Sequence, residues 1–255
     1  MMHELTQLFN PLSYLHLFKE IIRSLVHPTL QEEKPLRFPF LRVVIMVFLI
    51  SLVFKVVALF INLWAENQFG FDHETPGPER SIWLTLLFVG FAGPIVEELI
   101  FRLPMRLNAR NLSIALALGA VFFLFGKWIN QQMEHWASDT DLRSILQFLV
   151  KMSSAAVLAF LLSLILRGLD PILVAFGKAR FPWVFYLLTV VFGFAHVSNF
   201  QFSEHNLLYI VPLTLPQIIG GLFLGYTRYT FGLKYAVLQH SCGNLLTLLP
   251  ALLIN

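Results

Sequence analysis

Charge and cysteine are both scarce in this sequence of 255 residues. Only 13% of the residues are charged, about half of the roughly 25% that is usual in soluble domains, and 57% are hydrophobic. A single cysteine, Cys242, cannot form a disulfide within the chain, and it excludes a cysteine-rich zinc or iron–sulfur site. The net charge of +3 is small and dispersed, so it gives no reason to expect a nucleic-acid partner. These shortages indicate an integral membrane protein.

Two motifs of well-known hydrolases are absent as well. The sequence lacks HExxH, the helical zinc motif in which two histidines flank a glutamate base. It also lacks GxSxG, and Ser241 points away from the neighbouring His240 if both lie on a helix, so no serine nucleophile is predicted. Hydrolytic chemistry would therefore need a different set of groups.

Long hydrophobic runs are abundant, and the mean hydropathy is +0.71. A bilayer core of roughly 30 Å requires about 20 mostly apolar residues as a helix, because the backbone there has no water to bond with. We therefore predict an all-α, polytopic membrane bundle of seven transmembrane helices. They cover residues 40–64, 82–103, 112–130, 145–166, 183–201, 207–226 and 235–254. An eighth span within residues 1–39 is the alternative.

Residues 1–39 are predicted to form a cytoplasmic or interfacial segment. Apolar residues recur there at helical spacing opposite charged ones, which is typical of an amphipathic helix on a membrane surface. The apolar positions are Leu15, Phe18, Ile21, Ile22 and Leu25, and the charged ones are Lys19, Glu20 and Arg23. No short apolar core with a cleavage site follows a basic start, so a signal peptide is not predicted. Residues 40–255 are predicted to form one transmembrane domain.

Lysine and arginine are distributed unevenly between the predicted loops. The segment before the first span, with the second, fourth and sixth loops, holds thirteen of them, whereas the first, third and fifth loops hold three. Lys55 and Lys151 lie within spans. Because positive charge gathers on the cytoplasmic side of a membrane, we predict a cytoplasmic N-terminus and a C-terminus on the other side.

Polar residues inside the predicted spans are the candidates for function, because such residues are costly in lipid and usually mark a site or a buried pair. The second span carries Glu97, Glu98 and Arg102 near its end. Glu98 and Arg102 are four residues apart, which favours an ion pair on one helix face. Glu97 is turned about 100° away from Glu98, so we predict that it faces a cavity as a general base.

The fifth and seventh spans carry the remaining polar candidates. His240 and Asn244 are four residues apart on one face of the seventh span, where both could donate hydrogen bonds to an oxyanion. His196 lies in the fifth span and is accompanied by Asn199. A carboxylate, two histidines and an amide within apolar spans together predict a site that activates water.

These three segments resemble the signature of the CAAX prenyl endopeptidase and bacteriocin-processing (CPBP) family of intramembrane proteases. The matching motifs are EExxxR, FxxxH and HxxxN, which correspond to Glu97, Glu98 and Arg102, to Phe192 and His196, and to His240 and Asn244. The resemblance covers roughly residues 82–250 and implies that 40–255 is a transmembrane protease domain.

The resemblance also implies roles for the matched residues. Glu97 with His196 would activate water for attack on a peptide carbonyl, and His240 with Asn244 would stabilise the oxyanion. Glu98, Arg102 and Phe192 would support the site.

Two chemistries stay open for such a site. In one, a carboxylate and a histidine deprotonate water without a cofactor, as in a glutamate-type protease. In the other, a metalloprotease, Glu97, His196 and His240 would ligate Zn²⁺. We favour the metal-free chemistry because HExxH is missing.

The predicted function is endoproteolysis of a membrane-bound or lipidated peptide, for which prenylated CAAX-type substrates are implied only by the family's name. The alternatives are a proton- or ion-coupled transporter, in which the same groups would relay protons, and a bacteriocin-immunity scaffold without turnover. The predicted location is a bacterial plasma membrane, with the lipid bilayer and the substrate as partners and no nucleic acid.

Overall fold

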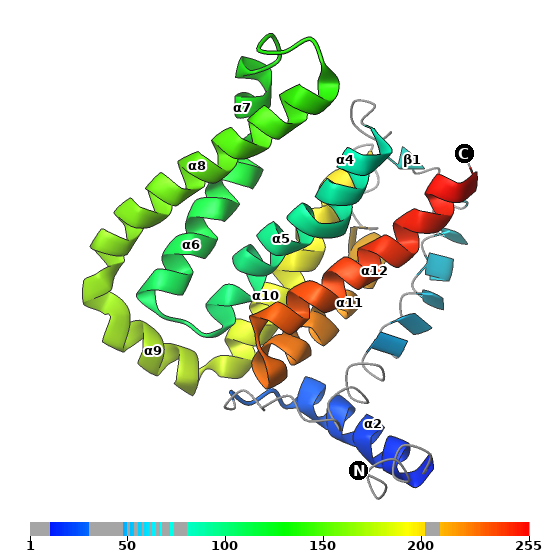
Figure 1. Cartoon of the computed structure of the whole chain (residues 1–255). Helices are drawn as coiled ribbons and strands as arrows, with labels where there is room; N and C mark the ends of the chain where they lie inside the picture. The colour runs from blue at the N-terminus through cyan, green and yellow to red at the C-terminus, as the bar shows by residue number, and fades with distance from the viewer. Residues whose placement is uncertain are drawn as a thin grey trace, which may run out of the picture. The chain divides into compact units, whose positions relative to one another are not determined.

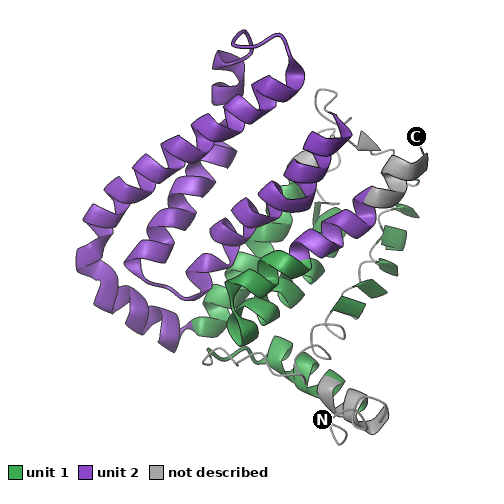
Figure 2. Ribbon diagram, viewed as in Figure 1, with its two compact units in different colours: residues 1–75, 181–239 green, residues 76–180, 240–255 purple. Residues whose placement is uncertain are grey.

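The structure is a computed structural model, and it describes residues 11–30, 81–201 and 210–254 together with scattered positions between 48 and 73. These residues are helical for most of their length, which confirms the predicted all-α class for them (Figure 1). A two-residue antiparallel pair, β1 (Asp72–His73) and β2 (Phe200–Gln201), is also present. The chain divides into two compact units, residues 1–75 with 181–239 (unit 1) and residues 76–180 with 240–255 (unit 2) (Figure 2).

Three described helices are long and apolar enough to cross a membrane, namely Ile82–Met105, Thr140–Ala179 and Ile210–Phe231. A fourth is reached if Ala109–Leu124 and Gly126–Gln132, which are bent by 57° at their junction, form one broken span. This number is below the predicted seven. The first predicted span, 40–64, falls largely outside the described residues, and within 1–39 the described residues 11–30 contain a helix of 16 residues that is not among the membrane-length helices. The fifth, predicted over 183–201, is a helix of only 15 residues.

Unit 2 contains the second, third and fourth predicted spans. The second consists of α4 (Ile82–Leu87), η1 (Phe88–Ala92), α5 (Gly93–Phe101) and η2 (Leu103–Met105). The third consists of α6 (Ala109–Gly119), η3 (Ala120–Leu124) and α7 (Gly126–Gln132). The fourth is α8 (Thr140–Leu166), followed by η4 (Arg167–Leu169) and α9 (Asp170–Ala179). α6 packs against both α5 and α8.

Side chains define where these helices begin. Ser81, Asn108 and Asp139 precede α4, α6 and α8, and each accepts a hydrogen bond from the backbone N–H three residues later. Such caps satisfy N–H groups that have no partner inside the helix. The three helix starts are therefore encoded locally, by small polar residues placed directly before apolar runs.

The ends of the spans in unit 2 meet as the predicted topology requires. The backbone N–H of Ala109, after the second span, donates to Asp170 Oδ1 after the fourth, at 2.6 Å. The backbone N–H of Ser81, before the second span, donates to Asp141 Oδ1 before the fourth, at 3.0 Å. Loops predicted on the same side of the membrane are therefore in contact, as expected for spans that alternate in direction.

Unit 1 contains α2 (Pro11–Val26), α10 (Phe181–Ala195), η5 (His196–Asn199), α11 (Ile210–Phe231) and the first residues of α12 (Leu233–Ile254), which enters unit 2 at His240. The helix predicted near the N-terminus is confirmed as α2. Its residues Ile21 and Leu25 are buried. The end of α2 is held by two tyrosines, because Tyr229 Oη donates to Ser24 O and Tyr186 Oη donates to Leu25 O.

Close packing of α10 against α11 depends on Gly193. A Cβ atom at this position would overlap Ile218 Cγ1 and lie 3.2 Å from the Ile218 backbone nitrogen. We expect Gly193→Ala to destabilise the protein by about 1–3 kcal/mol, which is the usual cost of overpacking. Thermal unfolding in detergent, followed by circular dichroism, measures this loss.

Two variants control this prediction. Gly168→Ala should leave stability within about 0.5 kcal/mol, because nothing lies within 4 Å of a Cβ there. Ile218→Ala should recover part of the loss when it is combined with Gly193→Ala, since it removes the overlapping atom. Equal effects of the two glycine substitutions would contradict the packing argument.

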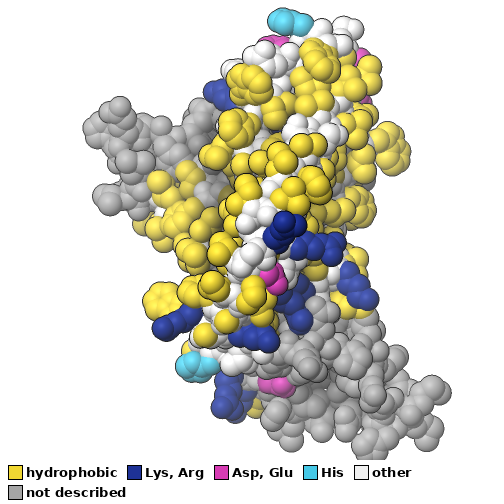
Figure 3. Space-filling view, turned by 90° about the vertical axis from the view of Figure 1, so that its left-hand side faces the viewer, with side chains coloured by type: hydrophobic (Ala, Val, Ile, Leu, Met, Phe, Trp, Pro, Cys, Tyr) yellow, Lys and Arg dark blue, Asp and Glu magenta, His cyan; other side chains and the backbone are white. Residues whose placement is uncertain are grey.

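Much of the described surface is apolar, as a membrane protein requires. On α8, Val157, Phe160, Leu161 and Ile165 are each at least half exposed. Figure 3 shows hydrophobic side chains over most of one face, with Lys and Arg side chains gathered toward one end of it. This pattern is compatible with a lipid-facing surface bordered by a positively charged interface.

Candidate functional site

The EExxxR segment lies at the end of α5 and forms the predicted ion pair. Arg102 Nε is 3.6 Å from Glu98 Oε2, and both side chains are completely buried. Arg102 also lies beside the ring of Phe101, with its guanidinium carbon 5.9 Å from the ring centroid. The prediction that Glu98 and Arg102 pair through helical spacing is therefore confirmed.

His240, on α12, joins this pair. Its Nδ1 atom is 3.0 Å from Glu98 Oε1, and its Nε2 atom is 3.7 Å from Glu97 Oε2. The imidazole is almost fully buried, at 8% exposure. One histidine thus lies between the two adjacent carboxylates, whereas the sequence analysis connected Glu97 with His196 and grouped His240 with Asn244. Helical periodicity could not show this contact because α5 and α12 are about 140 residues apart in the chain.

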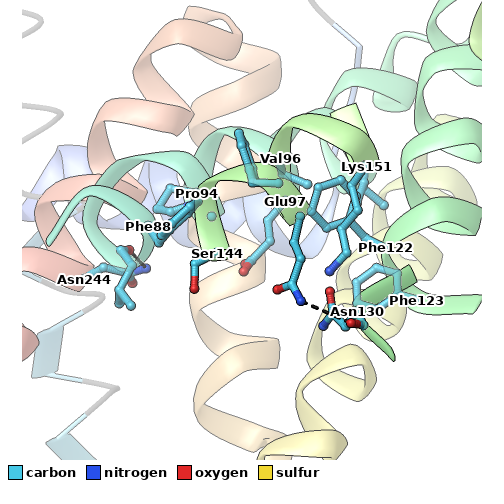
Figure 4. A pocket seen from close by; sticks show the side chains of 15 residues that line it. Phe88, Pro94, Val96, Glu97, Phe122, Phe123, Asn130, Ser144, Lys151 and Asn244 are labelled. Carbon is cyan, nitrogen blue, oxygen red and sulfur yellow. Dashed lines mark hydrogen bonds between the residues drawn. The ribbon is translucent and has the colours of Figure 1, made fainter. Parts of the chain in front are cut away.

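Glu97 faces a cavity, as its position on the helix predicts. The side chain is 29% exposed, whereas neighbouring Glu98 is completely buried. The cavity has a volume of about 410 Å³ and is lined from η1, α5, η3, α7, α8 and α12 (Figure 4). Asn244 also lines it. Unit 2 therefore presents a carboxylate and an amide to the same pocket.

Asn244 has a structural partner that follows from the backbone of the second span. In η1, Gly93 donates its N–H to Phe88 O, five residues back. The corresponding donor for Val89 O would be residue 94, but Pro94 has no N–H. Asn244 Nδ2 donates to Val89 O instead, at 2.9 Å. The amide nitrogen carries two hydrogens, so this bond leaves one for a ligand.

We expect Asn244→Leu to destabilise the protein by about 0.5–1.5 kcal/mol, the usual net contribution of one hydrogen bond, because the exposed Val89 carbonyl would lose its donor. Pro94→Ala restores a backbone N–H at the position opposite that carbonyl. In the Pro94→Ala background the Asn244→Leu substitution should therefore cost less than half as much. Denaturation of the four proteins in detergent provides the double-mutant cycle.

Thr247→Val is the matched control for this cycle. Thr247 lies one turn further along α12 and bonds only to carbonyls of its own helix, Gly243 O and Asn244 O. It should change stability by less than about 0.5 kcal/mol in both backgrounds. Asn244→Leu could instead lower the free energy of unfolding equally with proline and with alanine at position 94. That result would refute the argument that Asn244 replaces the missing N–H of Pro94.

Phe192 and His196 belong to unit 1 and are adjacent to each other there. Phe192 is buried in α10, and His196 is the first residue of η5, directly after that helix ends. His196 Nδ1 is 2.9 Å from Phe192 O, and the two rings meet edge to face with centroids 4.8 Å apart. The FxxxH motif therefore forms a local unit, while the pairing of His196 with Glu97 stays a prediction.

The cavity is also lined by polar residues that the sequence analysis did not select. Lys151 was recognised only as a charge within a span, and Ser144 and Gln147 were not considered. Ser144, Gln147 and Lys151 are three and four residues apart, so they lie on one face of α8. That spacing is visible in the sequence, but it does not show that this face of α8 lines the same cavity as Glu97.

Zinc ligation requires more groups than unit 2 supplies by itself. Glu97 Oε2 and His240 Nε2 could provide two ligands, whereas catalytic zinc sites use three protein ligands. Among the residues that the structure describes, no group of three or more His, Cys, Asp and Glu side chains is arranged to hold a metal ion. A zinc site would therefore need His196, the third residue of the predicted set.

Unit 2 thus combines a buried Glu98–Arg102 pair, a histidine held on Glu98, and a cavity into which Glu97 projects. No protein-family model, curated protein or solved structure matches this chain.

Proposed function

We propose that this protein is an intramembrane endopeptidase of the type that the CPBP motifs imply. The observation that carries the proposal is the contact of His240 with both carboxylates, Glu98 through Nδ1 and Glu97 through Nε2, together with the position of Glu97 in the lining of a cavity. A buried carboxylate that fixes one ring nitrogen leaves the other directed at the reacting group, which is how acid–base histidines are oriented in hydrolases. The completely buried Arg102 holds Glu98 in place from the opposite side.

In the proposed reaction, Glu97 takes a proton from a water molecule in the cavity as the water oxygen bonds to the peptide carbonyl carbon. The carbonyl oxygen becomes an oxyanion, and His240 Nε2 and the second N–H of Asn244 are the donors proposed to stabilise it. Collapse of this intermediate breaks the C–N bond, and Glu97 returns its proton to the leaving amine. His196 is proposed to assist the activation of water. Glu98, Arg102 and Phe192 position the groups that react.

Zinc dependence is the second form of this proposal, with Glu97, His196 and His240 as the ligands. A bound Zn²⁺ would supply Lewis-acid activation of the water. The metal-free form assigns the proton transfer to Glu97, which contacts His240 in unit 2, while His240 is held by Glu98. We adopt the metal-free form as the one to test first.

The remaining parts of the proposal concern the membrane. Seven spans, a cytoplasmic N-terminus and a bacterial plasma membrane are proposed from the distribution of hydrophobic and basic residues. The membrane-length helices in both units and the paired loop contacts of unit 2 support an integral bundle. The proposed substrates are membrane-bound or lipidated peptides, because the site lies on helices that are apolar enough to be surrounded by lipid.

Detergent-purified protein should cleave at least one member of a set of membrane-associated and prenylated reporter peptides. Activity that persists in a strong zinc chelator is expected for metal-free chemistry, whereas loss that is reversed by added Zn²⁺ would identify a metalloprotease. Folded protein that cleaves none of these peptides would contradict the proposal. In that case proton flux in reconstituted vesicles would test the transporter alternative.

A further inference from the structure

Lys151 is the charged residue of the cavity for which the proposed mechanism has no use. It lies in the middle of α8, within the candidate span Thr140–Ala179. A lysine at the centre of a membrane helix costs on the order of 2.5–3.5 kcal/mol to insert, and such residues commonly mark ligand paths. Lys151 lines the same cavity as Glu97, so a ligand bound in the cavity can contact it.

The ammonium group lies on the wall formed by η3 and α7. Lys151 Nζ is 5.6 Å from the centroid of the Phe122 ring and 3.8 Å from the place that a Cβ on Gly126 would occupy. In Figure 4, Glu97 lies between Asn244 on one side and Lys151 with Asn130 on the other. The Glu97 carboxylate and the Lys151 ammonium are therefore at different places along the cavity.

Neutral hydrogen-bonding groups accompany the ammonium. Gln147 Nε2 donates to the backbone oxygen of Asn130, at 3.2 Å, which brings the two amide side chains to the same wall. Ser144, nearly buried, lies one turn before Gln147 on the cavity face of α8. An ammonium in a cavity that is also lined by amide and hydroxyl groups is suited to bind an oxyanion of a ligand.

An aromatic row connects this polar wall with the side of the cavity on which Glu97 lies. Phe148 meets Phe88 edge to face at 5.3 Å between centroids, and it meets Phe122 in the same way at 6.2 Å. Phe88 is in η1, directly before α5, and Phe122 lies under the Lys151 ammonium. The cavity lining thus includes an aromatic row from η1 to η3 that suits hydrophobic side chains.

We propose that Lys151 binds a carboxylate of the substrate, so that an apolar peptide segment bearing a negative charge lies along the aromatic row with a peptide bond at Glu97. The inference rests on the proposed function, which it extends from membrane-associated peptides in general to anionic ones. A volume of about 410 Å³ is within the range of roughly 300–1,000 Å³ that is usual for ligand sites. The carboxylate can be the C-terminus of the peptide or the side chain of an acidic residue, since both offer the same group.

A different role for Lys151 would be purely structural. Its ammonium is close to the junction of η3 and α7, and lysine side chains stabilise carbonyl groups at helix ends. In that role Lys151 would affect stability but would not distinguish between ligands. Ligand selectivity is therefore the property to measure.

The test uses the full chain in detergent with Glu97→Gln, so that binding is measured without turnover. The probes are fluorescent tetrapeptides of leucine and valine, ending in a free carboxylate or in a carboxamide, and a carboxamide version with one internal aspartate. By fluorescence anisotropy, the free acid should bind about tenfold or more tightly than the neutral carboxamide. Lys151→Gln should remove this preference, and Lys151→Arg should keep most of it. Lys127→Gln, at an exposed lysine of α7, should have no effect.

Equal binding of acid and neutral carboxamide, or equal weakening of both by Lys151→Gln, would overturn the inference. Loss of stability in Lys151→Gln with unchanged selectivity would likewise overturn it and assign the lysine to the helix junction. Tight binding of the aspartate peptide would identify the side chain as an acceptable source of the carboxylate. Selective binding of acids by a protein that cleaves no peptide would refute the proposed function and leave the carboxylate site standing.

Discussion

Glu97→Gln is expected to lower kcat/KM for peptide hydrolysis by at least about 100-fold, the usual contribution of a general base. Glutamine keeps the size of the side chain but cannot accept the proton of the attacking water. Because Glu97 is partly exposed in the cavity and Arg102 pairs with Glu98, the substitution should change the free energy of unfolding by less than about 0.5 kcal/mol. Initial rates with the reporter peptide and a denaturation curve measure the two effects separately.

Glu134→Gln is the matched control, since Glu134 is an exposed glutamate in the turn after α7 and does not line the cavity. It should retain full activity. Glu97→Gln protein with activity within about threefold of the unsubstituted chain would refute the catalytic role. A bacteriocin-immunity scaffold, which requires no turnover, should tolerate this substitution in its protective function.

The largest expected effect on stability is that of Arg102→Leu. Arg102 and Glu98 are both completely buried, and removing one member of a buried pair leaves the other charge without compensation. Such losses are typically about 3–5 kcal/mol. We therefore expect Arg102→Leu to unfold at a much lower denaturant concentration, whereas Arg110→Leu, at an exposed arginine of α6, should be nearly neutral.

A double substitution separates charge from packing in this prediction. Glu98→Gln removes the buried negative charge but keeps an oxygen that can accept the hydrogen bond from His240 Nδ1. The combination of Glu98→Gln with Arg102→Leu should therefore be more stable than Arg102→Leu alone. If the two changes are simply additive, Arg102 contributes through packing and not through its charge.

The sequence predicted those parts of the site that depend on helical spacing alone. Glu98 with Arg102 and the outward turn of Glu97 both follow from residues four or fewer positions apart on one helix, whereas Phe192 and His196 were matched only as a motif of the family. The amphipathic α2 followed from the same periodicity. These features are local, so the identity of the surrounding residues determines them.

The contacts that sequence analysis missed all join distant segments. His240 contacts Glu98 across 142 residues, and Asn244 donates to Val89 across 155. Periodicity gives the direction of a side chain around its own helix but not the neighbour it meets. The bend after η3 was also missed, because no proline marks it. The polar face of α8 could be read from the sequence, but not the cavity that it lines.

The wide π-helical turn of η1 also affects how the sequence of the second predicted span should be aligned with the sequences of homologues. A π-helical turn is equivalent to one residue inserted into a regular helix. Removing one residue between Phe88 and Ala92 would therefore restore a regular helix and leave the directions of the residues after it unchanged. Glu97 would still face the cavity, although its number would fall by one. A homologue with a regular helix here would thus be one residue shorter, and an ungapped alignment anchored on α4 would equate Glu97 with the homologue's second glutamate, which has the role of Glu98.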